Sequence, residues 1–332
     1  MKSFNKLFVV FVVIVLAITA VAATPVSAQE NVKIGILQFA THASLHNCYV
    51  GILEGLKNAG FEDGKNATIE YVDGQGEIET NNLAASNFVT KGYDIIIAIA
   101  TPAATASYAA AKDAGIPVVF SAVSDPVAAG LVKSLEKPES GATGTSDNLN
   151  FEGQLTMIRA FLPEAKKIGV LYTMSEANSI AQLATLTEVA KEHDFEIVSI
   201  GITDSSEVAM GAAQLVAEGV DALNNLTDNN VVNNFSVVIS AMDPAGIPAF
   251  GSEEEQVARY GCVASETLDY VALGVTTGEI AARVLKGEDI NTIPVAVVTD
   301  SKPVYSSENM KKFNLVLPEA YIDALDVSAV EK

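Results

Sequence analysis

The chain has 332 residues, 49% of them hydrophobic, and carries 41 acidic against 20 basic side chains, a formal net charge of −21. A surface this acidic repels nucleic acid, so we exclude that class of partner. Two cysteines, Cys48 and Cys262, are too few for a disulfide scaffold, and we expect both to be free thiols.

Residues 1–28 have the pattern of a secretory signal peptide. Lys2 and Lys6 form a basic start, Leu7 to Ala23 is apolar without a charge, and Val26-Ser27-Ala28 is a small-residue cleavage site. The apolar run is also close to membrane-spanning length, so a retained anchor is the alternative. Because no cysteine lies near the site, we expect no lipid anchor and place the mature chain in the periplasm.

The sequence after this leader repeats itself. Lys33-Ile34-Gly35-Ile36-Leu37 returns as Lys167-Ile168-Gly169-Val170-Leu171, and Ala114-Gly115-Ile116-Pro117 returns as Ala245-Gly246-Ile247-Pro248. Two similar halves in tandem predict two similar lobes, and a cleft between lobes is where small molecules usually bind.

Strand-like runs alternate with helical stretches through the first half. We expect strands at 32–37, 68–72, 95–100 and 118–122, with helices at 49–59, 77–90 and 102–114. This order predicts a parallel sheet with helices on both faces. The second half repeats the pattern from Ile168 to Phe250.

The pattern changes beyond Phe250. We expect a short strand at 263–264, a long helix at 270–286, a strand at 293–299 and a short helix at 318–325. The chain would cross between the lobes near 145–150, 268–271 and 299–303, which makes a hinge. The fold class is therefore α/β, with two Rossmann-like lobes whose parallel sheets are joined by a multi-strand hinge. Lobe 1 would hold 29–147 plus about 271–300, and lobe 2 would hold 148–270 plus about 301–332.

Ligands of open α/β sheets bind beyond the carboxyl ends of the strands. Thr101-Pro102-Ala103-Ala104 follows the third strand and starts a helix, so its free N–H groups suit a carboxylate, although an ordinary capped helix has the same pattern. The equivalent segment of the second half is Thr227-Asp228-Asn229-Asn230. Asp228 could pair with an ammonium group there, or simply favour the helix dipole. Together the two segments would hold a zwitterion such as an amino acid at both ends.

The loop after the first strand contains Phe39, His42 and His46, and we expect it to contact the ligand. On a helix the two histidines would share a face, so a metal site is the alternative. Further ligands do not cluster with them in an obvious way, so we expect neither a metal nor a cofactor. Ser124, Ser146 and Asp147 lie after other strands, and Asp269 would face the mouth of the cleft near a crossing.

Motifs of enzymes are missing from the sequence. Gly74-Gln75-Gly76 follows a strand, but Glu79 breaks the dinucleotide-binding fingerprint. There is no Walker loop, no nucleophile elbow and no Cys-x-x-Cys. We therefore expect a binding protein and not an enzyme.

A series of segments carries a family resemblance, and they occur in the family's order: Ala100 to Ala104, Phe120 to Val132, Leu171-Tyr172 with Ser175 to Ser179, Thr227 to Asn229, and Asp269-Tyr270 with Ala272 to Gly274. Together they resemble the ABC transporter substrate-binding family that includes tryptophan- and tyrosine-binding proteins. The resemblance covers nearly all of the mature chain. It implies a periplasmic-binding-protein-like type I fold that delivers a small molecule, often an aromatic amino acid, to a membrane permease. It also implies that the Thr101 helix start takes the carboxylate and Asp228 the amino group.

Two positions depart from the family's pattern, since an acid of the first loop is His46 here and Thr267 stands near a place that is often glycine. We expect a monomeric solute-binding protein of an ABC importer, with a small-molecule ligand and an ABC permease as partners. A ligand sensor of the same fold that signals to a membrane receptor is the alternative. The predicted ligand-binding residues are Phe39, His42, His46, Thr101, Ala103, Ala104, Ser124, Ser146, Asp147, Thr227, Asp228, Asn229 and Asp269.

Overall fold

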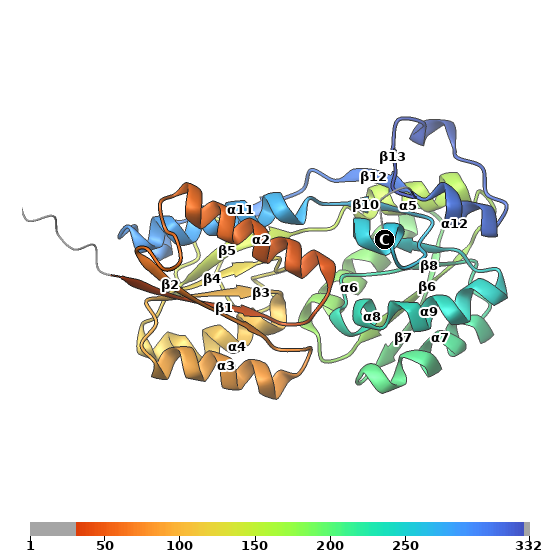
Figure 1. Ribbon diagram of the computed structural model, residues 1–332. Helices are drawn as coiled ribbons and strands as arrows, with labels where there is room; N and C mark the ends of the chain where they lie inside the picture. Colours follow the sequence, from red (N-terminus) through yellow and green to blue (C-terminus); the bar gives the residue numbers. More distant parts are fainter. Residues whose placement is uncertain (1–30, 329–332) are drawn as a thin grey trace, which may run out of the picture.

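The computed structural model describes residues 31–328, which form two lobes arranged side by side (Figure 1). The predicted signal peptide, residues 1–28, and the last four residues lie outside the described part. No helix within 31–328 combines the length and the apolar content that a membrane span requires.

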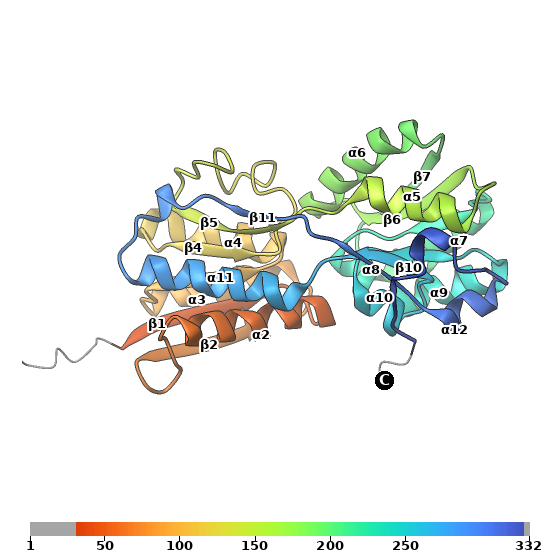
Figure 2. The ribbon, with the colours of Figure 1, turned by 90° about the horizontal axis from the view of Figure 1, so that it is seen from above.

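Lobe 1 is built on a six-stranded parallel sheet in the order β11-β5-β4-β3-β1-β2. Helices α2 and α11 cover one face and α3 and α4 the other, as Figures 1 and 2 show. All of β3 is buried, because helices exclude water from both faces of the sheet. The strands are β1 (Val32–Gln38), β2 (Ala67–Asp73), β3 (Ile95–Ile99), β4 (Val118–Ser121), β5 (Ala142–Asp147) and β11 (Ala296–Val298), and the helices are α2 (Ala43–Asn58), α3 (Ile78–Thr90), α4 (Thr101–Ala111) and α11 (Tyr270–Leu285).

Lobe 2 is built on a seven-stranded sheet in the order β13-β12-β10-β9-β8-β6-β7, parallel except where β12 runs antiparallel to β10. Its strands are β6 (Lys167–Thr173), β7 (Glu196–Ile202), β8 (Ala222–Asn224), β9 (Ala249–Gly251), β10 (Ala264–Thr267), β12 (Lys302–Tyr305) and β13 (Leu325–Asp326). Its helices are α5 (Phe151–Phe161), α6 (Ala177–Glu192), α7 (Val208–Ala217), α8 (Asn229–Asn233), α9 (Phe235–Met242), α10 (Glu254–Ala258) and α12 (Ser307–Lys312).

The internal sequence repeat corresponds to a structural repeat. The order β2-β1-β3-β4-β5 in lobe 1 matches β7-β6-β8-β9-β10 in lobe 2. Segments 148–150, 268–269 and 299–301 of the described chain run between the two sheets (Figure 2). The predicted fold class, two α/β lobes with parallel sheets and a multi-strand hinge, is confirmed.

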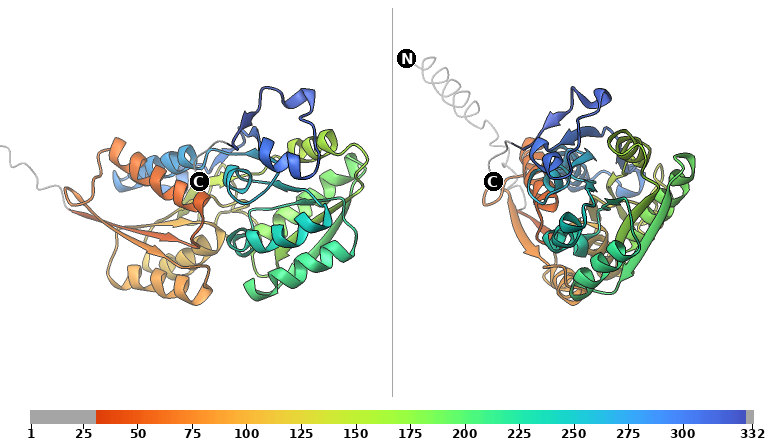
Figure 3. Two further views of the ribbon diagram at one scale, coloured as in Figure 1. Left: turned by 45° about the vertical axis from the view of Figure 1, so that its right-hand side comes forward. Right: turned by 90° about the vertical axis from the view of Figure 1, so that its right-hand side faces the viewer.

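The tail and one helix start differ from the prediction. The expected helix at 318–325 is a 3-10 turn, Glu319–Tyr321, followed by β13, while β12 and α12 were not predicted. These elements are two to six residues long, too short to show a periodic pattern. The segment from β12 onward, dark blue in Figures 1 and 3, lies against lobe 2. Helix α2 begins at Ala43, six residues before the predicted start at 49.

Helices α2 and α11 pack backbone to backbone. A Cβ atom on Gly274 would overlap the carbonyl oxygen of Cys48, and Gly51, Gly55 and Gly278 are equally crowded by the backbone of the facing helix. Only glycine, which has no Cβ, permits this approach. The contact fixes α11, the helix that enters lobe 1 from lobe 2, to the rest of lobe 1.

Candidate functional site

A small cavity lies between the lobes, at the carboxyl ends of β3, β4 and β5. Its free space is about 10 Å³, which holds roughly one water molecule and no amino acid, so the lobes are closed on each other. Lobe 1 lines it with His42, Leu45, Ala100, Thr101, Ala122, Ser124, Asp147 and Tyr270, and lobe 2 with Asn178, Thr227, Asn229 and Glu253.

Polar contacts hold the closed arrangement. His42 Nε2 lies 3.3 Å from Asn229 Oδ1 across the cleft. Gln182 of lobe 2 donates to the hydroxyl of Ser124 in lobe 1 at 2.8 Å. Glu255 of lobe 2 accepts hydrogen bonds from Ser44 and Asn47 at the start of α2. Each of these contacts would break if the lobes opened.

Two alanines that line the cavity have a strained backbone. Ala100, after β3, has φ 78° and ψ 155°, and Ala122, after β4, has φ 53°. A residue with a Cβ adopts such angles at a cost of about 1–3 kcal/mol. Strain at two neighbouring strand ends that face one cavity indicates a functional constraint on this edge of the sheet.

The first turn of α4 presents hydrogen-bond donors to the cavity. The first N–H groups of a helix have no acceptor within the helix. Thr101 is 3% exposed, lines the cavity, and its Oγ1 has no partner among residues 31–328. These groups suit a carboxylate, as predicted for this segment. Ala103 and Ala104 are buried in the core of lobe 1 behind this turn.

Two buried carboxyl groups face the same cavity from different lobes. Asp147 accepts hydrogen bonds from Ser124 Oγ at 3.1 Å and Tyr270 OH at 3.2 Å, and burial raises its pKa to about 6. Glu253 accepts from Gln256 at 2.9 Å, and burial raises its pKa to about 8. No lysine or arginine within residues 31–328 lines the cavity. The site therefore favours a cation or bound protons.

Asp228 faces its own lobe and not the cavity. Its Oδ1 accepts from Thr173 Oγ1 at 2.8 Å and Val231 N at 2.9 Å, and its Oδ2 accepts from Ser179 Oγ at 2.7 Å and Thr173 N at 2.5 Å. A carboxylate with four hydrogen bonds has no free acceptor position for an ammonium group. The structure thus places Asp228 as the cap of α8, tied to β6, and not in the cavity.

Glu176 was not predicted, but it positions the lobe 2 side of the site. It is 2% exposed and accepts from Asn229 N at 3.1 Å, Asn229 Nδ2 at 2.6 Å and Asn230 N at 3.2 Å. Burial, and next the charge of Asp228, raise the pKa of Glu176 to about 8. Through these bonds Glu176 orients Asn229 toward His42.

Seven predicted residues do not line the cavity: Phe39, His46, Ala103, Ala104, Ser146, Asp228 and Asp269. Phe39 is in the core of lobe 1, His46 is exposed on α2 beside Tyr49, and Asp269 is exposed and caps α11 through Ala272 N at 2.9 Å. Contact of these three residues with a ligand stays a prediction. His42 does line the cavity, and burial lowers its pKa to about 4, so the ring is neutral near pH 7.

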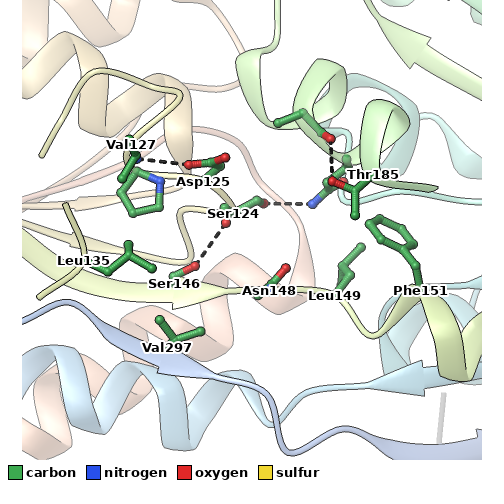
Figure 4. A pocket seen from close by; sticks show the side chains of 13 residues that line it. Ser124, Asp125, Val127, Leu135, Ser146, Asn148, Leu149, Phe151, Thr185 and Val297 are labelled. Atoms are coloured by element: carbon green, nitrogen blue, oxygen red, sulfur yellow. Dashed lines mark hydrogen bonds between the residues drawn. The ribbon is translucent and has the colours of Figure 1, made fainter. Parts of the chain in front are cut away.

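A pocket of about 280 Å³ adjoins the cavity on the hinge side (Figure 4). Ser124 lines both spaces, and Ser146 lines the pocket and donates to the Ser124 carbonyl at 3.1 Å. Leu135, Leu149 and Phe151 give the pocket an apolar wall. Together the two spaces provide polar groups next to an apolar surface.

Residues 31–328 contain no group of three or more His, Cys, Asp or Glu that could hold a metal ion. Cys48 and Cys262 are unbonded and buried, one in the core of each lobe.

Known proteins resemble this chain over most of its length. The sequence model of the family described as ABC transporter substrate binding protein matches residues 33–328. A tyrosine-binding protein of Clostridioides difficile (strain R20291) is 38% identical over 287 residues, which are 86% of this chain and 82% of that protein. A crystal structure of an ABC domain in complex with L-Trp from Streptococcus pneumonia is 32% identical with a TM-score of 0.85, over 89% of this chain and 99% of that chain.

A second structure shows which arrangement of the lobes is present here. The ligand-free, open structure of a substrate binding protein with adhesive properties from Clostridium difficile is 37% identical over 89% of this chain and 98% of that chain, but its TM-score is 0.67. The more similar sequence thus gives the poorer superposition. Sequence divergence does not explain this order, whereas a different angle between the lobes does. The lobes of this chain are arranged more like those of the L-Trp complex.

Proposed function

Because this chain belongs to the ABC transporter substrate binding protein family, we propose that it captures an amino acid with a large side chain outside the cytoplasm for an ABC importer. The observation that carries the proposal is the chemistry of the interlobe cavity. The donors of the Thr101 turn and the buried carboxyl groups of Asp147 and Glu253 all line this cavity. These are the complements of the carboxylate and the ammonium group of a free amino acid.

The adjoining pocket is the reason for proposing a ligand with a large side chain. An amino acid held by its polar groups in the cavity needs room for its side chain, and the cavity alone has almost none. The 280 Å³ beside Ser124, with its wall of Leu135, Leu149 and Phe151, offers space and apolar surface. The similarity to a tyrosine-binding protein and to an L-Trp complex supports an aromatic amino acid as the ligand of this chain.

Closing of the lobes would complete the site. Groups on both lobes line the cavity, so neither lobe by itself can enclose a ligand. The three interlobe connections allow rotation of the lobes and keep them together. We propose that a monomer binds the ligand in this way and presents the closed form to a permease.

Titration calorimetry of purified protein tests the proposal. We expect one molecule of L-tyrosine or L-tryptophan to bind per chain, and 3-(4-hydroxyphenyl)propionate, which lacks the ammonium group, to bind more weakly than L-tyrosine. Absence of binding for all twenty standard amino acids would contradict the proposal. Loss of uptake of the bound amino acid in cells lacking this chain would then separate import from sensing.

A further inference from the structure

Asp147 and Glu253 belong to different lobes but share one cavity. Asp147 ends β5 in lobe 1, Glu253 precedes α10 in lobe 2, and they are 3% and 2% exposed. A buried carboxylate without a counter-charge is unfavourable, because it loses its hydration and the protein interior solvates the charge less well than water does. Two carboxylates in one cavity therefore disfavour the closed arrangement of the lobes, unless a positively charged group or protons also enter the cavity.

We propose that Asp147 and Glu253 together form the receptor for the ligand's ammonium group, and that protons take its place when the cleft closes empty. The inference rests on the proposed function, since it names the residues that recognise the ligand's charge and what regulates them. In this proposal Asp147 and Glu253 take the role that the sequence predicted for Asp228, whose carboxylate accepts four hydrogen bonds from its own lobe.

Unpartnered polar atoms around the pair indicate that a ligand belongs there. Thr101 Oγ1 and His42 Nδ1 are buried and have no partner among residues 31–328, and both side chains line the same cavity. Each oxygen of Asp147 accepts one hydrogen bond, from Ser124 or from Tyr270, and so keeps a free lone pair. The cavity thus contains a hydroxyl group and a ring nitrogen without partners, together with carboxyl oxygens that can accept further hydrogen bonds.

The groups that surround the pair bring no positive charge at neutral pH. Burial lowers the pKa of His42 to about 4 and raises the pKa of Tyr270 and Cys48 well above their usual values, so all three are neutral. The remaining titratable neighbours are Cys262 and the acids Glu176 and Glu255. Burial raises the pKa of Asp147 to about 6 and of Glu253 to about 8, so both bind protons more readily in the closed form.

The linkage has a definite direction. The closed empty form binds protons that the open form, with its solvated carboxylates, releases near neutral pH. Acid therefore favours closing without a ligand, and higher pH favours the open form that a ligand can enter. An ammonium group can donate hydrogen bonds to both carboxyl groups and neutralises the charge of one of them, so the closed liganded form needs fewer protons than the closed empty form.

Two measurements on Glu253→Gln test the proposal, with Glu254→Gln, at the next residue but outside the cavity, as the matched control. The first is the ratio of affinities for L-tyrosine and 3-(4-hydroxyphenyl)propionate. We expect this ratio to fall about tenfold or more in Glu253→Gln and to stay unchanged in Glu254→Gln. An unchanged ratio in Glu253→Gln would overturn the receptor. Asp147→Asn provides a second variant if Glu253→Gln does not fold.

The second measurement needs no ligand. Small-angle scattering should show that the ligand-free wild type is more compact near pH 5 than near pH 8, and that Glu253→Gln, which mimics the protonated side chain, is already compact near pH 8. The proposal is overturned if the radius of gyration of the wild type is the same at both pH values, or if Glu253→Gln shows the same pH dependence as the wild type. If the wild type binds no amino acid, the proposed function fails, and this pH measurement alone decides about the pair.

Discussion

Replacing Asp228 by alanine should destabilise the fold and should not remove a direct ligand contact. The carboxylate caps α8 through Val231 N, and losing such a cap costs about 1 kcal/mol. Thr173 N, Thr173 Oγ1 and Ser179 Oγ would also lose their acceptor, at about 1–3 kcal/mol for each donor left unpaired. Removing a buried charge offsets part of this, because burial raises the pKa of Asp228 and so disfavours the charged form. We expect a net loss of about 3–5 kcal/mol.

Asp269→Ala is the matched control. Asp269 caps α11 in the same way, through Ala272 N at 2.9 Å, but its side chain is exposed. Its replacement should cost about 1 kcal/mol. Urea unfolding followed by circular dichroism measures both variants, and calorimetry measures the affinity of the folded fraction for L-tyrosine.

The result that would refute this reasoning is specific. A hundredfold loss of affinity in Asp228→Ala, with the free energy of unfolding unchanged, would show that the carboxylate contacts the ligand after all. Equal destabilisation by Asp228→Ala and Asp269→Ala would show that burial of the four hydrogen bonds contributes nothing.

Three further predictions concern stability. Gly274→Ala should lower the free energy of unfolding by several kcal/mol, because the added Cβ would overlap the backbone of α2. Glu279→Ala, at an exposed position of the same helix, should change the free energy of unfolding by less than about 0.5 kcal/mol, and similar values for the two variants would contradict the close packing. Ala100→Gly should raise the free energy of unfolding by up to about 1–2 kcal/mol because it relieves the strained φ, and a decrease would argue against strain. The contribution of Glu253 to the stability of the ligand-free protein is fully present below its unfolded pKa of about 4.3 and is lost as pH rises through the folded pKa of about 8. The melting temperature of the wild type should therefore fall over this pH range, and that of Glu253→Gln should fall less steeply.

The sequence was sufficient for the fold class because buried parallel strands are continuous apolar runs. Ile95–Ile99 is such a run, and its position before a helical stretch indicates a strand of a covered sheet. The repeat of Lys33 to Leu37 at Lys167 to Leu171 predicted two lobes, and the two sheets share the same strand order. Paired glycines four residues apart, Gly51 with Gly55 and Gly274 with Gly278, were a readable signal for close helix packing that the sequence analysis did not use.

The site was predictable where position along a strand determines direction. Thr101, Ser124 and Asp147 each follow or end a strand at its carboxyl end, and all three line the cavity. The internal repeat could also have indicated Glu253, because it follows β9, the counterpart of β4, just as Ser124 follows β4.

Only the tertiary structure decided which acid faces the cleft. Asp228 and Glu253 both follow strands of lobe 2, and nothing in their local sequence separates them. Asp228 turns inward because Thr173 and Ser179, distant in sequence, supply donors at the places where its oxygens lie. Glu253 has fewer such donors and lines the same cavity as Asp147 of the other lobe. The direction and charge of a buried carboxyl group depend on neighbours from several segments, and these neighbours come together only when both lobes are folded and closed.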